Sequence, residues 1–303
     1  MPPSSPPSDA ASSDIAAPAT IRVALQGTAE RLAEAGIADP LVDAELLVGH
    51  VLRLSRGAVQ AAVVRGDALA PERARALDEL VARRAAREPL QHITGVAPFR
   101  HLELRVGPGV FVPRPETEIV AQIAIDALTA AASPAPVAVD LGTGSGAIAL
   151  ALATEVPHAR VYAAENSPEA FPWTTENFER AGAANAHLVF ADLVDAFPEL
   201  DGTVSVVVSN PPYVPDDAIP RDPEVRLHDP KAALYGGPDG LDVVRLVSRT
   251  ALRLAHPGGA VVIEHGEWQG ADIRALLTAD GWRAAATHPD LTMRDRATTA
   301  LRP

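Results

Sequence analysis

Apolar residues follow a roughly helical spacing in the first part of the chain. The segment between Thr20 and about Glu88 is rich in Ala, Leu and Arg, and its apolar positions form stripes that suit amphipathic helices. Pro71 begins one of these stretches, and proline is favoured at the first position of a helix. We therefore predict a small all-α domain over residues 19–90. Residues 1–18, rich in Ser, Pro and Ala, are predicted to be a disordered tail.

A different pattern begins near residue 91. Apolar and polar residues alternate from position 99 to position 106, as they do in a half-buried strand. Residues 107–109 are Gly-Pro-Gly, which forms turns, and an apolar Val-Phe-Val follows them. These features predict a β-hairpin linker over residues 91–113 with its turn at 107–109.

The rest of the chain, residues 114–303, alternates short β-branched runs with longer helical segments. This alternation predicts an α/β domain built on a seven-stranded, mostly parallel, doubly wound sheet. The last two strands are close together in the sequence, which predicts an antiparallel hairpin at the edge. The predicted strands are 137–140, 160–164, 187–190, 204–209, 260–264, 282–288 and 298–301.

Composition narrows the possible functions. The 303 residues are 47% hydrophobic and include no cysteine, which excludes disulfides, thiolate metal sites and a cysteine nucleophile. The net charge of −13 argues against broad binding to nucleic acid. No apolar run approaches the roughly 18 residues of a membrane span, and the N-terminus lacks the features of a signal peptide. We expect a cytoplasmic protein that does not bind membranes.

A glycine-rich turn follows the predicted strand 137–140. The sequence Asp140-Leu141-Gly142-Thr143-Gly144-Ser145-Gly146 leads directly into an apolar helical stretch. Glycines allow a tight turn and let a ligand approach the backbone closely. The lysine of a P-loop is missing, whereas the spacing does match the dinucleotide pattern G-x-G-x-x-G/A. The carboxylate of Asp140 favours a cationic ligand over a pyrophosphate.

Three further positions follow predicted strands. Glu165 ends the second strand of the α/β region, where a carboxylate can accept hydrogen bonds from both hydroxyls of a ribose. The alternative for Glu165 is a surface acid at a strand end. Asp192 and Leu193 follow the third strand, and their position in such a fold would place them beside an adenine. They are equally compatible with an ordinary loop.

The fourth strand of this region ends in Ser209-Asn210-Pro211-Pro212-Tyr213. An amide or exocyclic NH2 is a poor nucleophile because its lone pair is delocalised, so an enzyme must orient it toward a methyl donor. The side-chain oxygen of Asn210 and the carbonyl of Pro211 can accept hydrogen bonds from its two N–H groups. Tyr213 offers a flat face to a planar group. The alternative is a proline-rich loop that ends the strand.

Several segments resemble known families. The D-x-G-x-G-x-G turn resembles motif I of class I S-adenosylmethionine-dependent methyltransferases, and Asn-Pro-Pro-Tyr resembles a motif of adenine N6- and glutamine N5-methyltransferases. Residues 88–95 (EPLQHITG), 112–118 (VPRPETE) and 233–241 (ALYGGPDGL) are similar to the PrmC/HemK family. This resemblance runs from about Thr20 to Leu301. It implies a Rossmann-like fold and direct in-line methyl transfer to the glutamine of the Gly-Gly-Gln motif in class-one peptide chain release factors.

The resemblance also implies which residues form the site. The S-adenosylmethionine contacts would be Asp140, Gly142, Thr143, Gly144, Ser145, Gly146, Glu165, Asp192, Leu193 and Asn210. The glutamine would be held by Asn210, Pro211, Pro212 and Tyr213, with Asn210, Pro211 and Tyr213 acting in catalysis, under a cover formed by Phe111, Arg114, Pro115 and Thr117. The helical domain would recognise the protein substrate, and we expect a monomer that binds no nucleic acid directly.

Two positions depart from the family pattern. Asp229-Pro230 replaces the usual Glu-Pro, and Met293 stands where the family usually has glycine. We expect both to affect loop geometry rather than activity. The nine histidines lack metal-ligand spacing, so we predict no metal site, and His265 is interpreted as structural.

Three other functions remain to be weighed. An adenine N6-methyltransferase is the main alternative, although the acidic composition disfavours it. A non-catalytic binding module would keep only the glycine turn, and a nicotinamide-dependent oxidoreductase would use that turn for a dinucleotide.

Overall fold

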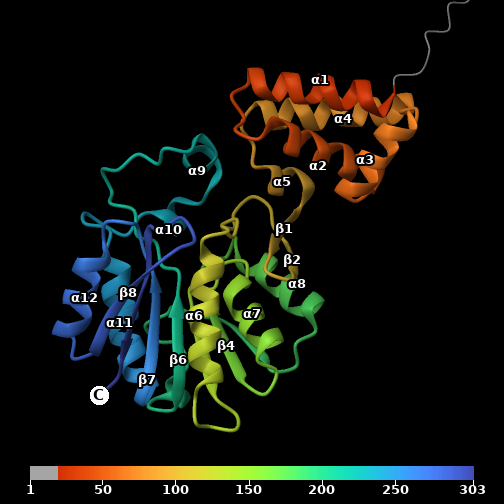
Figure 1. The fold of residues 1–303 in the computed structure, drawn as a ribbon. Helices are drawn as coiled ribbons and strands as arrows, with labels where there is room; N and C mark the ends of the chain where they lie inside the picture. Colours follow the sequence, from red (N-terminus) through yellow and green to blue (C-terminus); the bar gives the residue numbers. More distant parts are fainter. Residues whose placement is uncertain (1–19) are drawn as a thin grey trace, which may run out of the picture. The chain divides into compact units, whose positions relative to one another are not determined.

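The structure is a computed structural model that describes residues 20–303, so the predicted tail over residues 1–18 lies outside the described residues. The chain divides into two compact units, one ending at Arg87 and the other spanning Glu88–Pro303 (Figure 1). Within the described part, every helix is too short or too polar to cross a membrane.

The first unit is helical, as predicted. Thr20 and Ser55 cap helices by accepting hydrogen bonds from the backbone N–H groups of Val23 and Ala58. The helix over residues 56–65 was not predicted, because its Ala- and Val-rich sequence has no clear apolar stripe. The helices are α1 (Ile21–Glu34), α2 (Pro40–Leu52), α3 (Arg56–Arg65) and α4 (Pro71–Ala85).

Several arginines on α4 or just after it form hydrogen bonds and ion pairs with other residues of the first unit. Arg73 donates to the carbonyl of Val51 at 2.9 Å, and Arg87 donates to the carbonyl of Gly36 at 2.7 Å. Arg84 is buried and pairs with Asp43 at 2.7 Å. These arginines therefore stabilise the helical unit.

The second unit begins with α5 (Leu90–Thr94) and an antiparallel hairpin, β1 (Val96–Phe99) and β2 (Leu102–Arg105). The hairpin is confirmed, but the predicted turn at residues 107–109 is wrong. Phe99 pairs with Leu102, so Arg100 and His101 form the turn. Arg100 adopts a positive φ of 53° without being glycine, because its guanidinium is held by Glu155 and Gln122.

The sheet of the second unit has seven strands within the described residues, in the order β5-β4-β3-β6-β7-β9-β8. β9 runs antiparallel between β7 and β8, and the other neighbouring strands are parallel, as predicted. Every residue of β3 and β6 is buried, which suits strands covered on both faces. The strands are β3 (Val137–Leu141), β4 (Arg160–Glu165), β5 (Ala186–Phe190), β6 (Val204–Ser209), β7 (Ala255–Glu264), β8 (Arg283–Pro289) and β9 (Asp295–Leu301).

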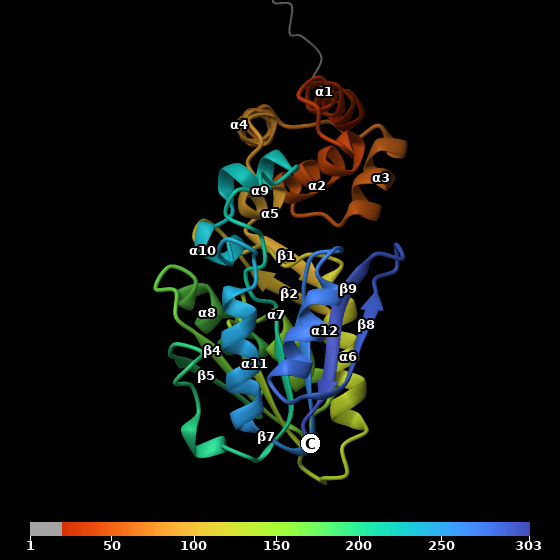
Figure 2. The ribbon, with the colours of Figure 1, turned by 90° about the vertical axis from the view of Figure 1, so that its left-hand side faces the viewer.

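Two hydrophobic clusters hold helices on opposite faces of this sheet. One joins the sheet to α6 (Thr117–Thr129), α7 (Ala147–Glu155) and α8 (Phe171–Ala181). The other joins it to α11 (Asp242–Leu254) and α12 (Gly270–Ala279). Figures 1 and 2 show the two groups on either side of the strands. The segment between β6 and α11 contains α9 (Pro223–His228) and α10 (Lys231–Leu234), and a short 3-10 helix, η1 (Pro198–Leu200), precedes β6.

Candidate active site

A cavity of about 880 Å³ opens at the carboxyl ends of the parallel strands. It lies where the strand order reverses between β3 and β6, which is the usual ligand position in a doubly wound sheet. The structure brings nearly all the predicted site residues to its wall. The exceptions are Gly146 and Pro115, which do not line it.

The glycine turn exposes backbone to the cavity. Gly142 and Gly144 have positive φ angles of 73° and 57°, and a Cβ at either would meet no atom within 4 Å. Side chains there would fill open space that the cavity now offers to a ligand. Gly146 has a different task, because its Cβ would lie 3.0 Å from the ring of Phe178 on α8. Gly146 therefore allows close helix packing.

Asp140 lies beneath this turn and is fully buried. Its Oδ2 accepts hydrogen bonds from the hydroxyl of Thr143 at 2.6 Å and from the backbone N–H of Ala149 at 3.1 Å. Burial raises the pKa of Asp140 to about 7, although these two hydrogen bonds oppose the shift. Its Oδ1 has no partner. Asp140 thus fixes the turn to the start of α7, and it leaves one carboxyl oxygen unpaired beside the cavity.

Glu165 ends β4 and reaches the same turn. Its Oε2 accepts from the N–H of Gly144 at 2.8 Å, and its Oε1 accepts from the N–H groups of Asn166 and Ser167. These bonds hold a carboxylate in the cavity wall at the end of β4. Asp192 is exposed and Leu193 is half-buried, and both line the wall beyond β5.

Two buried polar residues of α8 support the turn and were missed in the sequence. Thr174 donates its hydroxyl to the carbonyl of Gly144 at 2.5 Å. Asn177 donates to the carbonyl of Ser145 at 2.9 Å, and it exchanges two hydrogen bonds with the backbone of Arg105 in β2. Their only sequence signal is that both are polar residues on the apolar side of an amphipathic helix.

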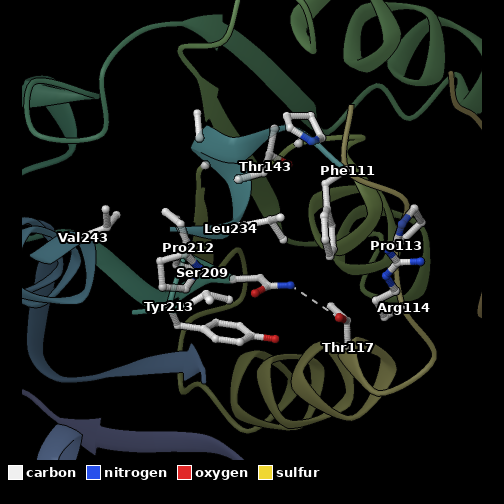
Figure 3. Close-up of a pocket in the computed structure, with 18 of the residues that line it drawn as sticks. Phe111, Pro113, Arg114, Thr117, Thr143, Ser209, Pro212, Tyr213, Leu234 and Val243 are labelled. Atoms are coloured by element: carbon white, nitrogen blue, oxygen red, sulfur yellow. Dashed lines mark hydrogen bonds between the residues drawn. The ribbon is translucent and has the colours of Figure 1, made fainter. Parts of the chain in front are cut away.

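The Asn-Pro-Pro-Tyr segment forms the part of the wall next to the glycine turn, because β6 pairs with β3. Ser209 donates its hydroxyl to the carbonyl of Leu141 at 2.6 Å and so ties β6 to β3. The side-chain nitrogen of Asn210 lies 3.5 Å from the hydroxyl of Thr117, as the dashed line in Figure 3 shows. The backbone carbonyl of Tyr213 accepts from Gln269 at 2.9 Å. The segment is therefore anchored on both sides of Asn210.

Glu264 is a buried acid next to this segment that sequence reasoning passed over. It ends β7 and is 1% exposed, and its Oε2 has no partner. Burial raises the pKa of Glu264 to about 7, while the side chain of Thr117, the charge of Arg296 and the amide of Asn210 oppose the rise. A carboxylate that ends an otherwise apolar strand was the available signal. The neighbouring His265 is structural, because its two nitrogens bond the carbonyl of Gly266 and the hydroxyl of Thr298.

Comparison with known proteins places this geometry in a family. Residues 23–95 match the PrmC N-terminal domain, and residues 101–223 match the methyltransferase small domain. A release factor glutamine methyltransferase of Streptomyces coelicolor is 52% identical over 89% of this chain and 94% of its own length. One of Bifidobacterium longum is 45% identical over 88% of this chain and 94% of its own length. The chain belongs to the release factor glutamine methyltransferase family.

One relative in this group is named for a different acceptor. A 4-amino-L-phenylalanine/4-methylamino-L-phenylalanine methyltransferase of Streptomyces pristinaespiralis is 40% identical over 95% of this chain and 97% of its own length. This chain is therefore similar both to relatives named for release factors and to one named for an aromatic amine.

The two departures from the family pattern have structural explanations. Asp229 is buried and pairs with Arg114, whose guanidinium lies 5.0 Å from the ring centre of Phe111. Asp229 therefore contacts a residue that lines the cavity, and it lies nearer the site than the sequence predicted. Met293 has a φ of 65°, a conformation that glycine adopts without strain. It is exposed, which leaves room for its side chain.

Proposed function

We propose that this protein transfers a methyl group from S-adenosylmethionine to the side-chain amide nitrogen of the glutamine in the Gly-Gly-Gln motif of class-one release factors. The observation that carries this proposal is the position of Asn210, which lies in the wall of the same cavity as the glycine turn, at the end of the neighbouring strand. Such an amide can hold an acceptor NH2 facing a donor bound at the turn. Family membership supports the same reaction.

The residues present fit the proposed cofactor. Gly142 and Gly144 leave open space for its close approach, and Glu165 presents a carboxylate where ribose hydroxyls would lie. The unpaired Oδ1 of Asp140 puts a carboxyl oxygen, rather than a phosphate-binding lysine, near the turn. Leu193 would supply an apolar surface to the adenine. When bound, S-adenosylmethionine supplies a methyl group activated by a positively charged sulfur.

The protein's part in the transfer is to orient the acceptor. The side-chain oxygen of Asn210 and the carbonyl of Pro211 would accept hydrogen bonds from the two N–H groups of the glutamine. The nitrogen would then attack the methyl carbon in line with the carbon–sulfur bond, whose electrons return to sulfur. The nitrogen would afterwards lose a proton to water, so no strong base is needed. Tyr213 would pack against the flat amide.

An aromatic amine is a second candidate acceptor. The relative named for 4-amino-L-phenylalanine covers nearly the whole chain at 40% identity. An aromatic NH2 also has a delocalised lone pair and two N–H groups, so the same Asn210 and Pro211 acceptors would suit it. The greater identity to relatives named for release factors favours the protein substrate.

Radiolabelled S-adenosylmethionine distinguishes these acceptors. The enzyme should be incubated with a purified release factor, with the same factor carrying Asn in place of the motif glutamine, with 4-amino-L-phenylalanine, and with RNA or DNA. Label in the unaltered release factor alone is the expected result. Label only in the amine or only in nucleic acid would replace the proposal with the corresponding alternative.

A further inference from the structure

The carboxyl group of Glu264 has no step in the proposed transfer, yet it lies beside the residue that would hold the acceptor. β6 and β7 pair in parallel with Ser209 opposite Ile263, so Asn210 and Glu264 occupy the next positions at the same edge. Thr117, the first residue of α6, lies against both side chains. An acid enclosed at this point is costly to ionise unless nearby donors stabilise it.

When Glu264 is ionised, its charge determines which of the neighbouring groups donate hydrogen bonds and which accept them. A carboxylate only accepts, so the Thr117 hydroxyl must give it its single proton. The lone pairs of that hydroxyl then remain for the side-chain nitrogen of Asn210, which lies 3.5 Å away. The Glu264 carboxylate also accepts a hydrogen bond from the Asn210 amide itself. A nitrogen that bonds Thr117 and Glu264 leaves Oδ1 of Asn210 as the atom that faces the acceptor.

We infer that Glu264 is a positioning residue, which fixes the amide of Asn210 directly and through the hydroxyl of Thr117 so that the Asn210 oxygen faces the cavity. The inference rests on the proposed function, because only an acceptor with two N–H groups needs that oxygen. Without a partner, the oxygen and nitrogen of the Asn210 side chain could exchange places, because the two ends of an amide have nearly the same shape.

The orientation of the Asn210 amide should depend on pH, because it depends on whether Glu264 is ionised. Arg296 on β9 favours the ionised acid, whereas Glu116, just before α6, opposes it. The Tyr213 hydroxyl stays protonated, because burial and the charge of Glu264 raise the pKa of Tyr213. Below about pH 7 the Glu264 carboxyl binds a proton and becomes a donor. A donor at this place can bond Oδ1 of Asn210 and turn its NH2 toward the two N–H groups of the acceptor, where donors face donors and no hydrogen bond forms.

The test compares Glu264→Gln with the wild type. A glutamine keeps the size of the acid but can donate, so kcat should fall about ten- to a hundredfold, as it does when a positioned group is released. The KM for the release factor should change little. In the wild type kcat should rise through about pH 7, and this rise should be absent in Glu264→Gln. Thr117→Val should show the same loss of kcat, and Thr117→Ser should restore it.

Two further measurements separate positioning from a purely structural effect. Glu199→Gln, an identical change on an exposed acid remote from the cavity, is the matched control and should behave as wild type. In the unliganded protein, the NMR signals of the Asn210 side-chain NH2 should shift through about pH 7 in the wild type and stay constant in Glu264→Gln.

The outcomes are distinct for the two proposals. Undiminished kcat in Glu264→Gln, or a pH dependence of kcat and of the Asn210 signals that survives in it, overturns the inference and leaves the proposed function standing. A wild-type enzyme that never labels a release factor overturns the proposed function. The Asn210 signals then still decide whether Glu264 controls that amide.

Discussion

At the scale of single residues, Asn210 is the side chain on which the proposed chemistry depends. It lies at the end of β6, and its nitrogen is turned toward Thr117. The sequence identified it because Asn-Pro-Pro-Tyr is a local motif. Glu264 was passed over, because its closeness to Asn210 arises from strand pairing and not from chain order.

Asn210→Ala tests this residue directly. Removing an oriented acceptor of the reacting group should lower kcat by about 10²–10³-fold. Steady-state kinetics with a release factor would measure this fall, with Glu199→Gln as the control. Thermal unfolding should be nearly unchanged, since Asn210 is only half-buried. A kcat within twofold or threefold of wild type would show that Asn210 does not hold the acceptor.

Asp140 gives a prediction for the pH dependence of stability. Its pKa in the folded protein, about 7, lies above the value of about 3.9 in an unfolded chain. Folding therefore favours the protonated acid, and its contribution is present below about pH 4 and lost as the pH rises through about 7. Asp140→Asn should make the free energy of unfolding fall less steeply over this range. Denaturant titrations at several pH values would measure it, and an unchanged slope would contradict this account.

At the scale of elements, α8 acts as a brace between the glycine turn and the hairpin. Asn177 bonds Ser145 and both backbone groups of Arg105. Asn177→Ala would leave these buried groups unpaired and should reduce the free energy of unfolding by about 1–3 kcal/mol or more. It should also weaken cofactor binding, which calorimetry would measure. The exposed Glu179→Ala on the same helix is the control, and equal behaviour of the two variants would refute the bracing role.

The hairpin shows where element prediction failed. The Gly-Pro-Gly at residues 107–109 was the stronger turn signal in the sequence. The actual turn uses Arg100, whose unfavourable backbone is held by acids and an amide of α6 and α7. Long-range contacts of that kind are invisible to a local pattern. The central strands β3 and β6 were predictable because each is a short, mostly apolar run buried on both faces.

At the scale of the whole molecule, the question is whether the first unit helps to bind an intact release factor. If it recognises the folded release factor, as the family resemblance implies, an intact factor should have a much lower KM than a short Gly-Gly-Gln peptide. Their kcat values should be similar, because both present the same amide to Asn210. Kinetics of the full-length enzyme with each substrate would measure this. Equal KM values would show that the first unit takes no part in recognition.

The central claim concerns one nitrogen atom in one substrate. Mass spectrometry of a release factor treated with the enzyme and S-adenosylmethionine would locate the methyl group most directly. The account predicts a single methyl group on the side-chain nitrogen of the Gly-Gly-Gln glutamine, present with wild type and strongly reduced with Asn210→Ala. A release factor without that methyl group, or one methylated at another residue, would contradict it.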